Sequence, residues 1–224
     1  MNRLTLQVGW AVCALAILGV TGCRNKTDAG EVASVRLINA VPDAGGLDVS
    51  VNGRRVWKRA TFRSSTGYQS VASGTYPVTL DAAGLGTTLL TQSLAFDKGR
   101  NYTLLALGQA EGRRAKVQIL PDEQPAPLAA GKASVRLVNA SPGTAVDLVV
   151  NTIVGVKSVG YGRRSEPLVL SGGDYELQLA AAGTARMLVE PVHLSLAPGR
   201  RYTLIAMGKP GSRQSLSLEA YPDK

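Results

Sequence analysis

The chain has 224 residues, with 25 Lys and Arg against 16 Asp and Glu, and a formal net charge of +9 at pH 7. This length suffices for two domains of about 100 residues each, and the basic balance favours anionic partners. The cysteines are Cys13 and Cys23 and the histidine is His193. So few sulfur and imidazole groups argue against a disulfide scaffold and against a zinc site.

The first segment is typical of a signal peptide. A single basic residue, Arg3, precedes an apolar run from Val8 to Val20, which is shorter than the roughly 20 residues that cross a bilayer. The run ends in Val20-Thr21-Gly22-Cys23, which resembles the lipobox of bacterial lipoproteins. We therefore expect a signal peptide over residues 1–22 and a lipidated Cys23 followed by a tether over 23–31. The alternative is an ordinary signal peptide in which Cys23 has no role.

Export and lipidation would place the protein in the cell envelope, anchored to a membrane by its N-terminal lipid. The residue after the lipid site is Arg24 and not the aspartate that resembles an inner-membrane retention signal. We therefore expect the periplasmic face of the outer membrane where the source has two membranes. An exported protein is not expected to bind nucleic acid.

Most of the remaining chain is an internal repeat of two similar copies, 99 or 100 positions apart. Four blocks return in order, as Ser34–Pro42 and Ser134–Pro142, Leu47–Asn52 and Val146–Asn151, Gly74–Leu80 and Gly173–Leu179, and Gly99–Gly108 and Gly199–Gly208. A unit of about 90 residues is too long for a solenoid repeat and indicates a duplicated domain. We expect domain 1 over residues 32–121, a stiff proline-rich linker over 122–132 and domain 2 over 133–224, joined end to end.

Each copy has the pattern of strands. Tyr76, Val78 and Leu80 alternate with polar or proline positions, which indicates a strand with one buried face. The block from Tyr102 to Gly108 is apolar at nearly every position, as in a central strand covered on both sides, and Asn52-Gly53 is typical of a type I′ hairpin. About seven short strands per copy predict an all-β protein of two tandem antiparallel β-sandwich, immunoglobulin-like domains.

The repeated blocks resemble one bacterial family. The motifs Val-Arg-Leu-(Ile/Val)-Asn-Ala-x-Pro, Gly-x-Tyr and Tyr-Thr-Leu-(Leu/Ile)-Ala-x-Gly, together with the strand around Asp48, are similar to the domain of unknown function 4397. The resemblance covers residues 33–120 and 133–221 and implies tandem extracytoplasmic β domains, with no activity to transfer. The second copy departs from the pattern at Asn151-Thr152-Ile153, where the Asn-Gly hairpin is missing, and at Gly172–Asp174.

Several repeated polar residues are candidates for chemistry. Asp48 and Asp147 occupy equivalent strand positions, and Arg36 and Arg136 could pair with them across the sheet. A glycosidase would need two carboxylates at one cleft, whereas the repeat supplies one per domain. We expect Asn39 and Asn139 to bond the turn backbone, the repeated tyrosines Tyr76, Tyr102, Tyr175 and Tyr202 to be core residues with a hydroxyl partner, and His193 to be a partly exposed strand residue.

Basic side chains gather most densely just after the first hairpin, around Trp57. The candidate binding surface consists of Arg54, Arg55, Trp57, Lys58, Arg59 and Arg63. Trp57 and Tyr68 are expected to be the exposed aromatic pair. Further basic groups are Arg113, Arg114 and Lys116 in the first copy, and Arg163, Arg164, Arg200 and Arg201 in the second. Such charges either deter edge-to-edge aggregation or attract an anionic envelope surface.

These features together predict a membrane-anchored, non-catalytic lipoprotein that binds or scaffolds in the cell envelope, without cofactor or metal. Its partner would be an anionic envelope polymer or another envelope protein, and in the second case the protein would act as a structural spacer. The alternative is an envelope hydrolase whose site is assembled at the interdomain cleft.

Overall fold

The computed structural model describes residues 31–122, 127–143, 145–209, 211 and 214–224. The predicted signal peptide, Cys23 and the tether up to residue 30 lie outside the described residues, as do residues 123–126 of the predicted linker. In the part of the chain that is described, no helix is long and apolar enough to span a membrane.

The first copy forms two four-stranded sheets. One has the order β4-β1-β7-β8 and the other β3-β2-β5-β6. The strands are β1 (Val32–Ala40), β2 (Leu47–Val51), β3 (Arg54–Ala60), β4 (Gln69–Ala72), β5 (Gly74–Ala82), β6 (Thr87–Phe96), β7 (Asn101–Leu107) and β8 (Lys116–Pro121), with one 3-10 turn, η1 (Glu111–Arg113), before β8.

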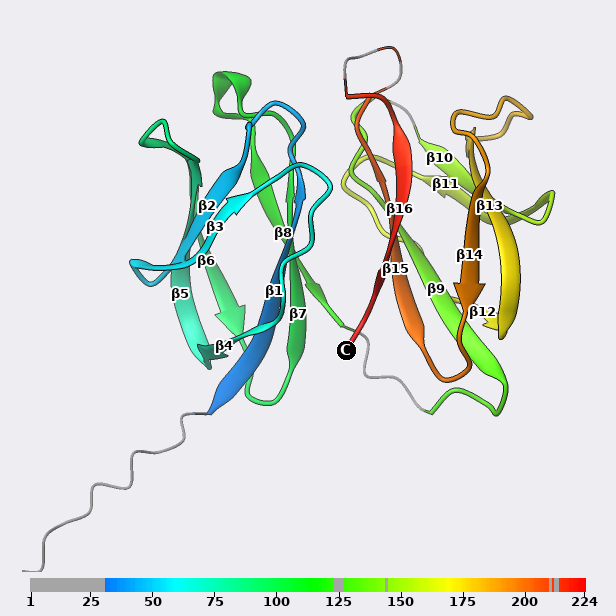
Figure 1. Ribbon diagram of the computed structural model, residues 1–224, viewed down its shortest axis with the longest axis horizontal. Coiled ribbons are helices and arrows are strands. Elements are labelled where there is room, and N and C mark those ends of the chain that lie inside the picture. Colours follow the sequence, from blue (N-terminus) through cyan, green and yellow to red (C-terminus); the bar gives the residue numbers. More distant parts are fainter. Residues whose placement is uncertain (1–30, 123–126, 144, 210, 212–213) are drawn as a thin grey trace, which may run out of the picture.

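The second copy repeats this arrangement, with sheet orders β12-β9-β15-β16 and β11-β10-β13-β14. Its strands are β9 (Lys132–Asn139), β10 (Val146–Val150), β11 (Ile153–Val159), β12 (Leu168–Ser171), β13 (Gly173–Ala181), β14 (Val192–Leu196), β15 (Arg201–Met207) and β16 (Ser217–Pro222). Figure 1 shows the two sandwiches side by side.

The predicted all-β fold of two sandwiches is confirmed, but two details of the prediction are wrong. Each copy has eight strands among the described residues and not seven. The sheets are also not purely antiparallel, because β1 pairs in parallel with β7 and β9 with β15. Two parallel neighbours need a long connection between them. Here the chain from β1 to β7 runs through β2 to β6, which form the rest of the sandwich. Sequence alternation does not reveal the direction of such a pairing.

Within each sandwich the core forms where the inward faces of the two sheets meet. In the first copy the alternating residues Val78 and Leu80 of β5 are fully buried, as are Leu47 and Val49 of β2. The second copy builds its own core from equivalent positions, such as Leu177 and Leu179. The period of two predicted for these strands therefore sets which face is inside.

The β2–β3 hairpin of the first copy and the β10–β11 hairpin of the second have the same backbone turn. Asn52 and Gly53 have φ values of 49° and 75°, and Asn151 and Thr152 have φ values of 47° and 71°. Two consecutive positive φ values define the type I′ turn that the Asn-Gly pair predicts. The second copy keeps this turn although it lacks glycine, and it does so with a β-branched residue in a conformation that such residues rarely adopt.

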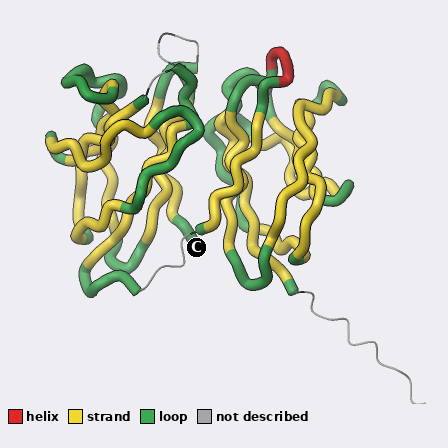
Figure 2. The backbone as a smooth tube through the Cα atoms, turned by 180° about the vertical axis from the view of Figure 1, so that it is seen from behind, coloured by secondary structure: helices red, strands yellow, loops and turns green. Residues whose placement is uncertain are grey.

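The two sandwiches pack against each other through the outward faces of their β1-type sheets. A third apolar cluster joins Ile38, Ala40, Leu105, Leu107 and Leu120 of the first copy to Val138, Ala140, Ile205, Met207 and Tyr221 of the second. The expectation that the domains are joined end to end is therefore wrong. Figures 1 and 2 show from opposite sides that β7 and β8 lie next to β15 and β16 in the middle of the molecule.

This packing explains why β7 and β15 are apolar at almost every position. In β7, Leu104 and Ala106 face the core of their own sandwich, whereas Leu105 and Leu107 face the other one. Both faces of the strand are thus covered, as its sequence predicts, and the second copy supplies one of the covers. The four sheets form four layers with three apolar cores between them.

Candidate functional site

A buried polar network crosses the interface between the two sandwiches. Arg36 donates from Nε to Thr103 Oγ1 at 2.8 Å, from Nη1 to Pro222 O at 2.6 Å and from Nη2 to Asp223 Oδ1 at 2.7 Å. Only 4% of Arg36 and 8% of Asp223 is exposed. The predicted pairing of Arg36 with Asp48 is therefore wrong, since Arg36 pairs with the end of the second copy.

Arg136 makes the corresponding contacts in the opposite direction. It donates from Nε to Thr203 Oγ1 at 2.9 Å, from Nη1 to Pro121 O of the first copy at 2.9 Å and from Nη2 to Asp223 Oδ2 at 3.3 Å. Asp223 thus accepts hydrogen bonds from the arginines of both copies. Because neither guanidinium is left without acceptors, the network satisfies the condition under which buried charges are tolerated.

Asp122 is the counterpart of Asp223 at the end of the first copy. It accepts hydrogen bonds from Thr103 Oγ1 at 3.1 Å and from the hydroxyl of Tyr68. The ring of Tyr68 also lies against Arg36, whose Cζ is 5.0 Å from the ring centroid. Tyr68 is half-buried and belongs to the interface, so the expectation that it forms an exposed aromatic pair with Trp57 is wrong.

Burial perturbs the titration of the groups in this network. Desolvation raises the pKa of Asp223 above its usual value, whereas Arg136 and Arg36 act in the opposite direction. Desolvation, with the hydrogen bond to Asp122, also raises the pKa of Tyr68, and desolvation raises that of Tyr221, whose hydroxyl donates to Arg63 O at 2.8 Å. Perturbed ionisation at this place reflects a packed interface, because every one of these groups has a partner within the protein.

Asp48 and Asp147 support an irregularity in the neighbouring strand. Asp48 Oδ1 accepts a hydrogen bond from Arg59 N at 2.8 Å, and Asp147 Oδ1 accepts one from Ser158 N at 2.6 Å. Arg59 and Ser158 have φ values of 47° and 55°, where β3 and β11 shift register against β2 and β10. The repeated carboxylates thus hold a β-bulge in each copy.

Asn39 and Asn139 bond the backbone, as predicted. Asn39 Oδ1 accepts from Val41 N and its Nδ2 donates to Ala60 O, both at 2.8 Å. Asn139 makes the same pair of bonds to Ser141 N and Val159 O, both at 2.9 Å. Each asparagine therefore ties the end of the first strand to the end of the third.

The expectations for the tyrosines and the histidine are confirmed. Tyr102 and Tyr202 are buried, and their hydroxyls accept hydrogen bonds from Asp97 N and Ala197 N, both at 3.1 Å. The half-buried Tyr76 and Tyr175 donate to backbone carbonyls. His193 is an exposed residue of β14, and the described residues hold no group of three or more metal-ligating side chains.

The predicted binding surface around β3 is only partly correct. Arg54, Arg55, Lys58 and Arg59 are exposed on β3, but Trp57 is 6% exposed and packs in the core of the first sandwich. Trp57 is buried because its side chain faces the core, although the charged residues Arg55 and Lys58 stand close to it in the sequence. We call the four exposed residues Arg54, Arg55, Lys58 and Arg59 the β3 surface.

Arg63 does not belong to the β3 surface either. Its Nη2 donates to Ser215 O at 2.8 Å, and its Nε lies 3.7 Å from Glu219 Oε1. Both partners are in the second copy. The proximity of Arg63 to Arg59 in the sequence is misleading, because the chain has left β3 and crosses to the interface.

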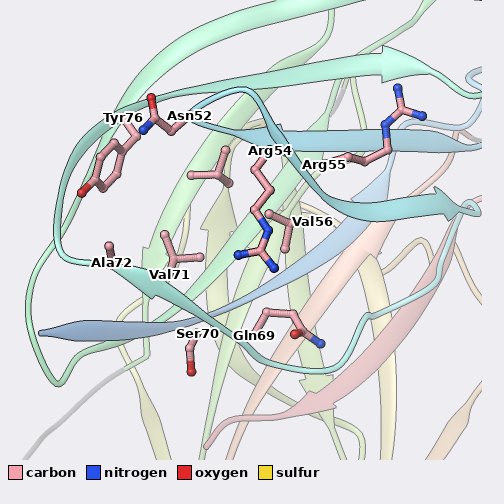
Figure 3. A pocket seen from close by; sticks show the side chains of 10 residues that line it. Asn52, Arg54, Arg55, Val56, Gln69, Ser70, Val71, Ala72 and Tyr76 are labelled. Atoms are coloured by element: carbon pink, nitrogen blue, oxygen red, sulfur yellow. The ribbon is translucent and has the colours of Figure 1, made fainter. Parts of the chain in front are cut away.

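A groove opens beside the β3 surface, between the edge strands β3 and β4 of the two sheets. We call it the β3–β4 groove. It holds about 290 Å³, and its lining comprises Val51, Asn52, Arg54, Arg55, Val56, Gln69, Ser70, Val71, Ala72 and Tyr76. In Figure 3 the guanidinium of Arg54 reaches into the gap toward Val71 and Gln69, whereas Arg55 points away from it. Arg55 pairs with Asp48, 3.2 Å from Nη1 to Oδ2.

The second copy does not reproduce this groove. Ile153 and Val154 occupy the positions of Arg54 and Arg55, and Leu168 the position of Gln69. A Cβ built on Gly155 would lie 2.9 Å from Leu168 Cδ2, so the leucine fills the space that faces Gly155. The hollow at this edge of the second copy, of about 340 Å³, lies farther along β11, between residues 155–160 and 163–168. The groove lined by Arg54 is therefore a property of the first copy and not of the repeat.

The hydrolase alternative placed its site at an interdomain cleft. The structure places a packed apolar cluster and the Arg36–Asp223–Arg136 network there instead. Two hollows lie at one edge of the interface, around Lys116 of the first copy and Tyr161 of the second, and no carboxylate lines them among the described residues. Two carboxylates flanking a substrate, as in a glycosidase, are not brought together there.

The fold and these contacts define a class of protein, a tandem pair of immunoglobulin-like sandwiches docked face to face. The chain belongs to the family described as "Domain of unknown function (DUF4397)", whose profile matches residues 33–145 and 133–224. No curated protein matched the chain in sequence.

Among solved structures, one that matches is a carbohydrate-binding module of family CBM26 from Eubacterium rectale Amy13K, in complex with maltoheptaose. It is 10% identical and the alignment covers 86% of this chain and 97% of that one, with a TM-score of 0.28. At this TM-score the likeness supports no conclusion about ligand or topology.

Sequence reasoning missed the central role of Asp122 and Asp223. Both follow a proline at the end of the last strand of their copy, in Leu120-Pro121-Asp122 and Tyr221-Pro222-Asp223. This repeated Pro-Asp pair was a usable signal. It marks a second carboxylate that recurs in each copy, besides Asp48 and Asp147.

Proposed function

We propose that the protein is a non-catalytic binding or scaffolding lipoprotein of the cell envelope, held to the membrane by lipid on Cys23. In this proposal the β3 surface and the β3–β4 groove face an anionic envelope polymer. The periplasmic face of the outer membrane is the expected location, on the grounds of Arg24.

One observation carries the proposal. Eight buried polar residues that the repeat preserves have partners within the protein: Arg36, Arg136, Thr103 and Thr203 in the interface, Asp48 and Asp147 at the bulges, and Asn39 and Asn139 at the strand ends. The cations of the β3 surface are exposed, and Arg54, Lys58 and Arg59 form no ion pair among the described residues. The β3 surface is therefore basic, lies outside the repeat pattern and is free to bind a partner.

The arrangement also suits binding because the surface is mounted on a rigid support. Asp48 holds the backbone of Arg59 and the side chain of Arg55, so part of the β3 surface is ordered before a ligand arrives. A preorganised site loses less conformational entropy on binding. Attraction to a polyanion through such a surface weakens with salt, because exposed charges are screened.

Cosedimentation tests the binding. The chain from residue 24 onward, which keeps both sandwiches whole, would be mixed with peptidoglycan, lipopolysaccharide or anionic vesicles at low and high salt. We expect salt-sensitive binding that is lost in an Arg54→Glu, Lys58→Glu variant and kept in a Lys157→Glu, Arg186→Glu variant with the same change of charge on the second copy. Equal binding by both variants, or no binding to any of the three, would refute the role of the β3 surface.

The anchor is tested separately in cells. Radioactive palmitate should label the full-length protein, and Cys23→Ala should abolish both the labelling and the membrane association. A protein that stays membrane-bound and unlabelled would overturn the lipid anchor and leave the binding surface to be judged by the cosedimentation alone.

A further inference from the structure

The two rims of the interface are equivalent by the repeat but differ in what fills them. At one rim Arg63 crosses to Ser215 O and Glu219 of the second copy. At the other rim the positions of Arg63 and Glu219 are taken by Gly162 and Gln118. Gly162 is the counterpart of Arg63 because each precedes an equivalent carbonyl: Ser64 O accepts from Asn39 N, and Arg163 O accepts from Asn139 N. Gln118 is the counterpart of Glu219 because the two pair with equivalent residues, Leu105 of β7 and Ile205 of β15.

The loss of the arginine side chain leaves a groove at this second rim. Two adjoining hollows of about 400 and 360 Å³ share Lys116 and Tyr161. They are lined from the first copy by residues 107–109 and 113–118, and from the second by Pro142 and by 161–163. We call this the interdomain groove. Its size is in the range of ligand pockets.

The interdomain groove is strongly basic. Arg113, Arg114 and Lys116 come from the first copy and Arg163 from the second, all four are exposed, and no carboxylate lines either hollow among the described residues. Four cations brought together from two domains create a positive potential that attracts anions. At the filled rim, by contrast, Glu219 offsets the charge of Arg63.

Two uncharged features of the groove indicate what else the ligand carries. Tyr161 is 38% exposed and lines both hollows, so its ring offers an apolar face where they join. Gln118 Oε1 is buried and has no donor among the described residues. A buried acceptor without a partner costs free energy, and it is satisfied by a ligand that donates a hydrogen bond.

The loops that carry the cations are held in place. The carboxylate of Asp43 accepts from Ala110 N at 2.8 Å and from Glu111 N at 3.0 Å, which fixes the start of η1. Gly108 comes so close to Arg114 O that a Cβ there would lie 2.3 Å from it. The loop of Tyr161 and Arg163 is fixed by the hydrogen bonds of Asn139 N to Arg163 O and of Gly162 N to Asn139 O.

We propose that the interdomain groove binds an acidic saccharide, in which a carboxylate or phosphate is carried on a sugar ring. The cations bind the anionic group, a ring hydroxyl donates to Gln118 Oε1, and the apolar face of the sugar packs on Tyr161. A small inorganic anion would use the charges but would leave Gln118 and Tyr161 without a partner. The site is separate from the β3 surface and does not depend on it.

Isothermal titration calorimetry on residues 24–224 tests the proposal with three probes, namely tetragalacturonate, its methyl ester and inorganic phosphate at equal ionic strength. We expect tetragalacturonate to bind, and both other probes to bind at least about tenfold more weakly. The ester keeps the rings and loses the charge, whereas phosphate keeps the charge and lacks the ring.

The blocking variant copies the filled rim into the open one, as Gly162→Arg with Gln118→Glu. It leaves the net charge unchanged, and the new arginine can adopt the backbone, since Arg63 has a φ of 66° and Gly162 one of 69°. We expect this variant to keep its melting temperature and to lose tetragalacturonate binding by at least about tenfold. Lys116→Gln serves as a second variant if the first fails to fold, and it should also weaken binding.

The Lys157→Glu, Arg186→Glu variant is the matched control, because neither residue lines the interdomain groove, and it should bind tetragalacturonate as the unaltered protein does. Binding that is kept in both groove variants and lost in the Arg54→Glu, Lys58→Glu variant would overturn the interdomain groove while supporting the β3 surface. Equal affinities for tetragalacturonate and phosphate would overturn the saccharide, and an absence of tetragalacturonate binding would overturn the proposal.

Discussion

Asp223→Ala is expected to destabilise the protein more than any surface change. The carboxylate accepts from Arg36 and Arg136, which are 4% and 2% exposed, and from Thr203. Its removal leaves two buried guanidinium groups short of an acceptor. Removing one partner of a buried ion pair costs about 3–5 kcal/mol, so we expect a loss of that size in the free energy of unfolding, measured by urea denaturation.

Two comparisons separate this effect from a general loss of charge. Lys98→Met breaks an ion pair on the surface, in which the side chains of Lys98 and Glu31 are both about two-thirds exposed. It should change the free energy of unfolding by no more than about 0.5 kcal/mol. Replacing all four charged groups of the network by Arg36→Met, Arg136→Met, Asp122→Asn and Asp223→Leu should cost less than Asp223→Ala alone, because no buried charge then remains. A loss below about 1 kcal/mol for Asp223→Ala would refute the reasoning.

Three further predictions concern the turn, the interface tyrosines and the core. Thr152→Gly should raise the free energy of unfolding by about 1 kcal/mol, since glycine adopts a φ of 71° without strain. A lower free energy of unfolding in urea denaturation would contradict this. Burial raises the pKa of Tyr68 and Tyr221 above 10, so the folded state keeps protons that the unfolded chain loses. The stability that these two hydroxyls contribute is therefore present below pH 10 and lost as the pH rises through the raised values. In spectrophotometric titration both should ionise only with unfolding, and normal titration in the folded protein would be inconsistent with their burial. Trp57→Ala should cost about 3–5 kcal/mol because the side chain lies in the core, whereas Lys58→Ala should stay within about 0.5 kcal/mol; equal melting temperatures would show that Trp57 is exposed.

Local sequence patterns predicted the parts of the fold that depend on near neighbours. Alternation in Tyr76, Val78 and Leu80 predicted the buried face of β5, and Asn52-Gly53 predicted a turn that the structure confirms. The apolar run of β7 showed that both of its faces are covered. These inferences succeed because strand period and turn chemistry act over a few residues.

The pairing of distant elements was beyond local patterns. Arg36 and Asp48 recur together in both copies, but they lie on the outward faces of opposite sheets and point away from each other. The sequence shows that Ile38 and Leu105 on the same face as Arg36 need a cover, and it does not show that the second copy provides it. Likewise, the charges around Trp57 indicated a surface, whereas the inward direction of Trp57 depends on the register of β3 with β2.

The docking of the two sandwiches is the central claim, and small-angle X-ray scattering from residues 24–224 tests it most directly. A compact chain of roughly 200 residues has a radius of gyration of about 16 Å, and the face-to-face arrangement predicts a value near this. Two domains of about 13 Å each, held apart by an extended linker, would give a value clearly above 20 Å and a scattering curve of two separated bodies, which would contradict the account.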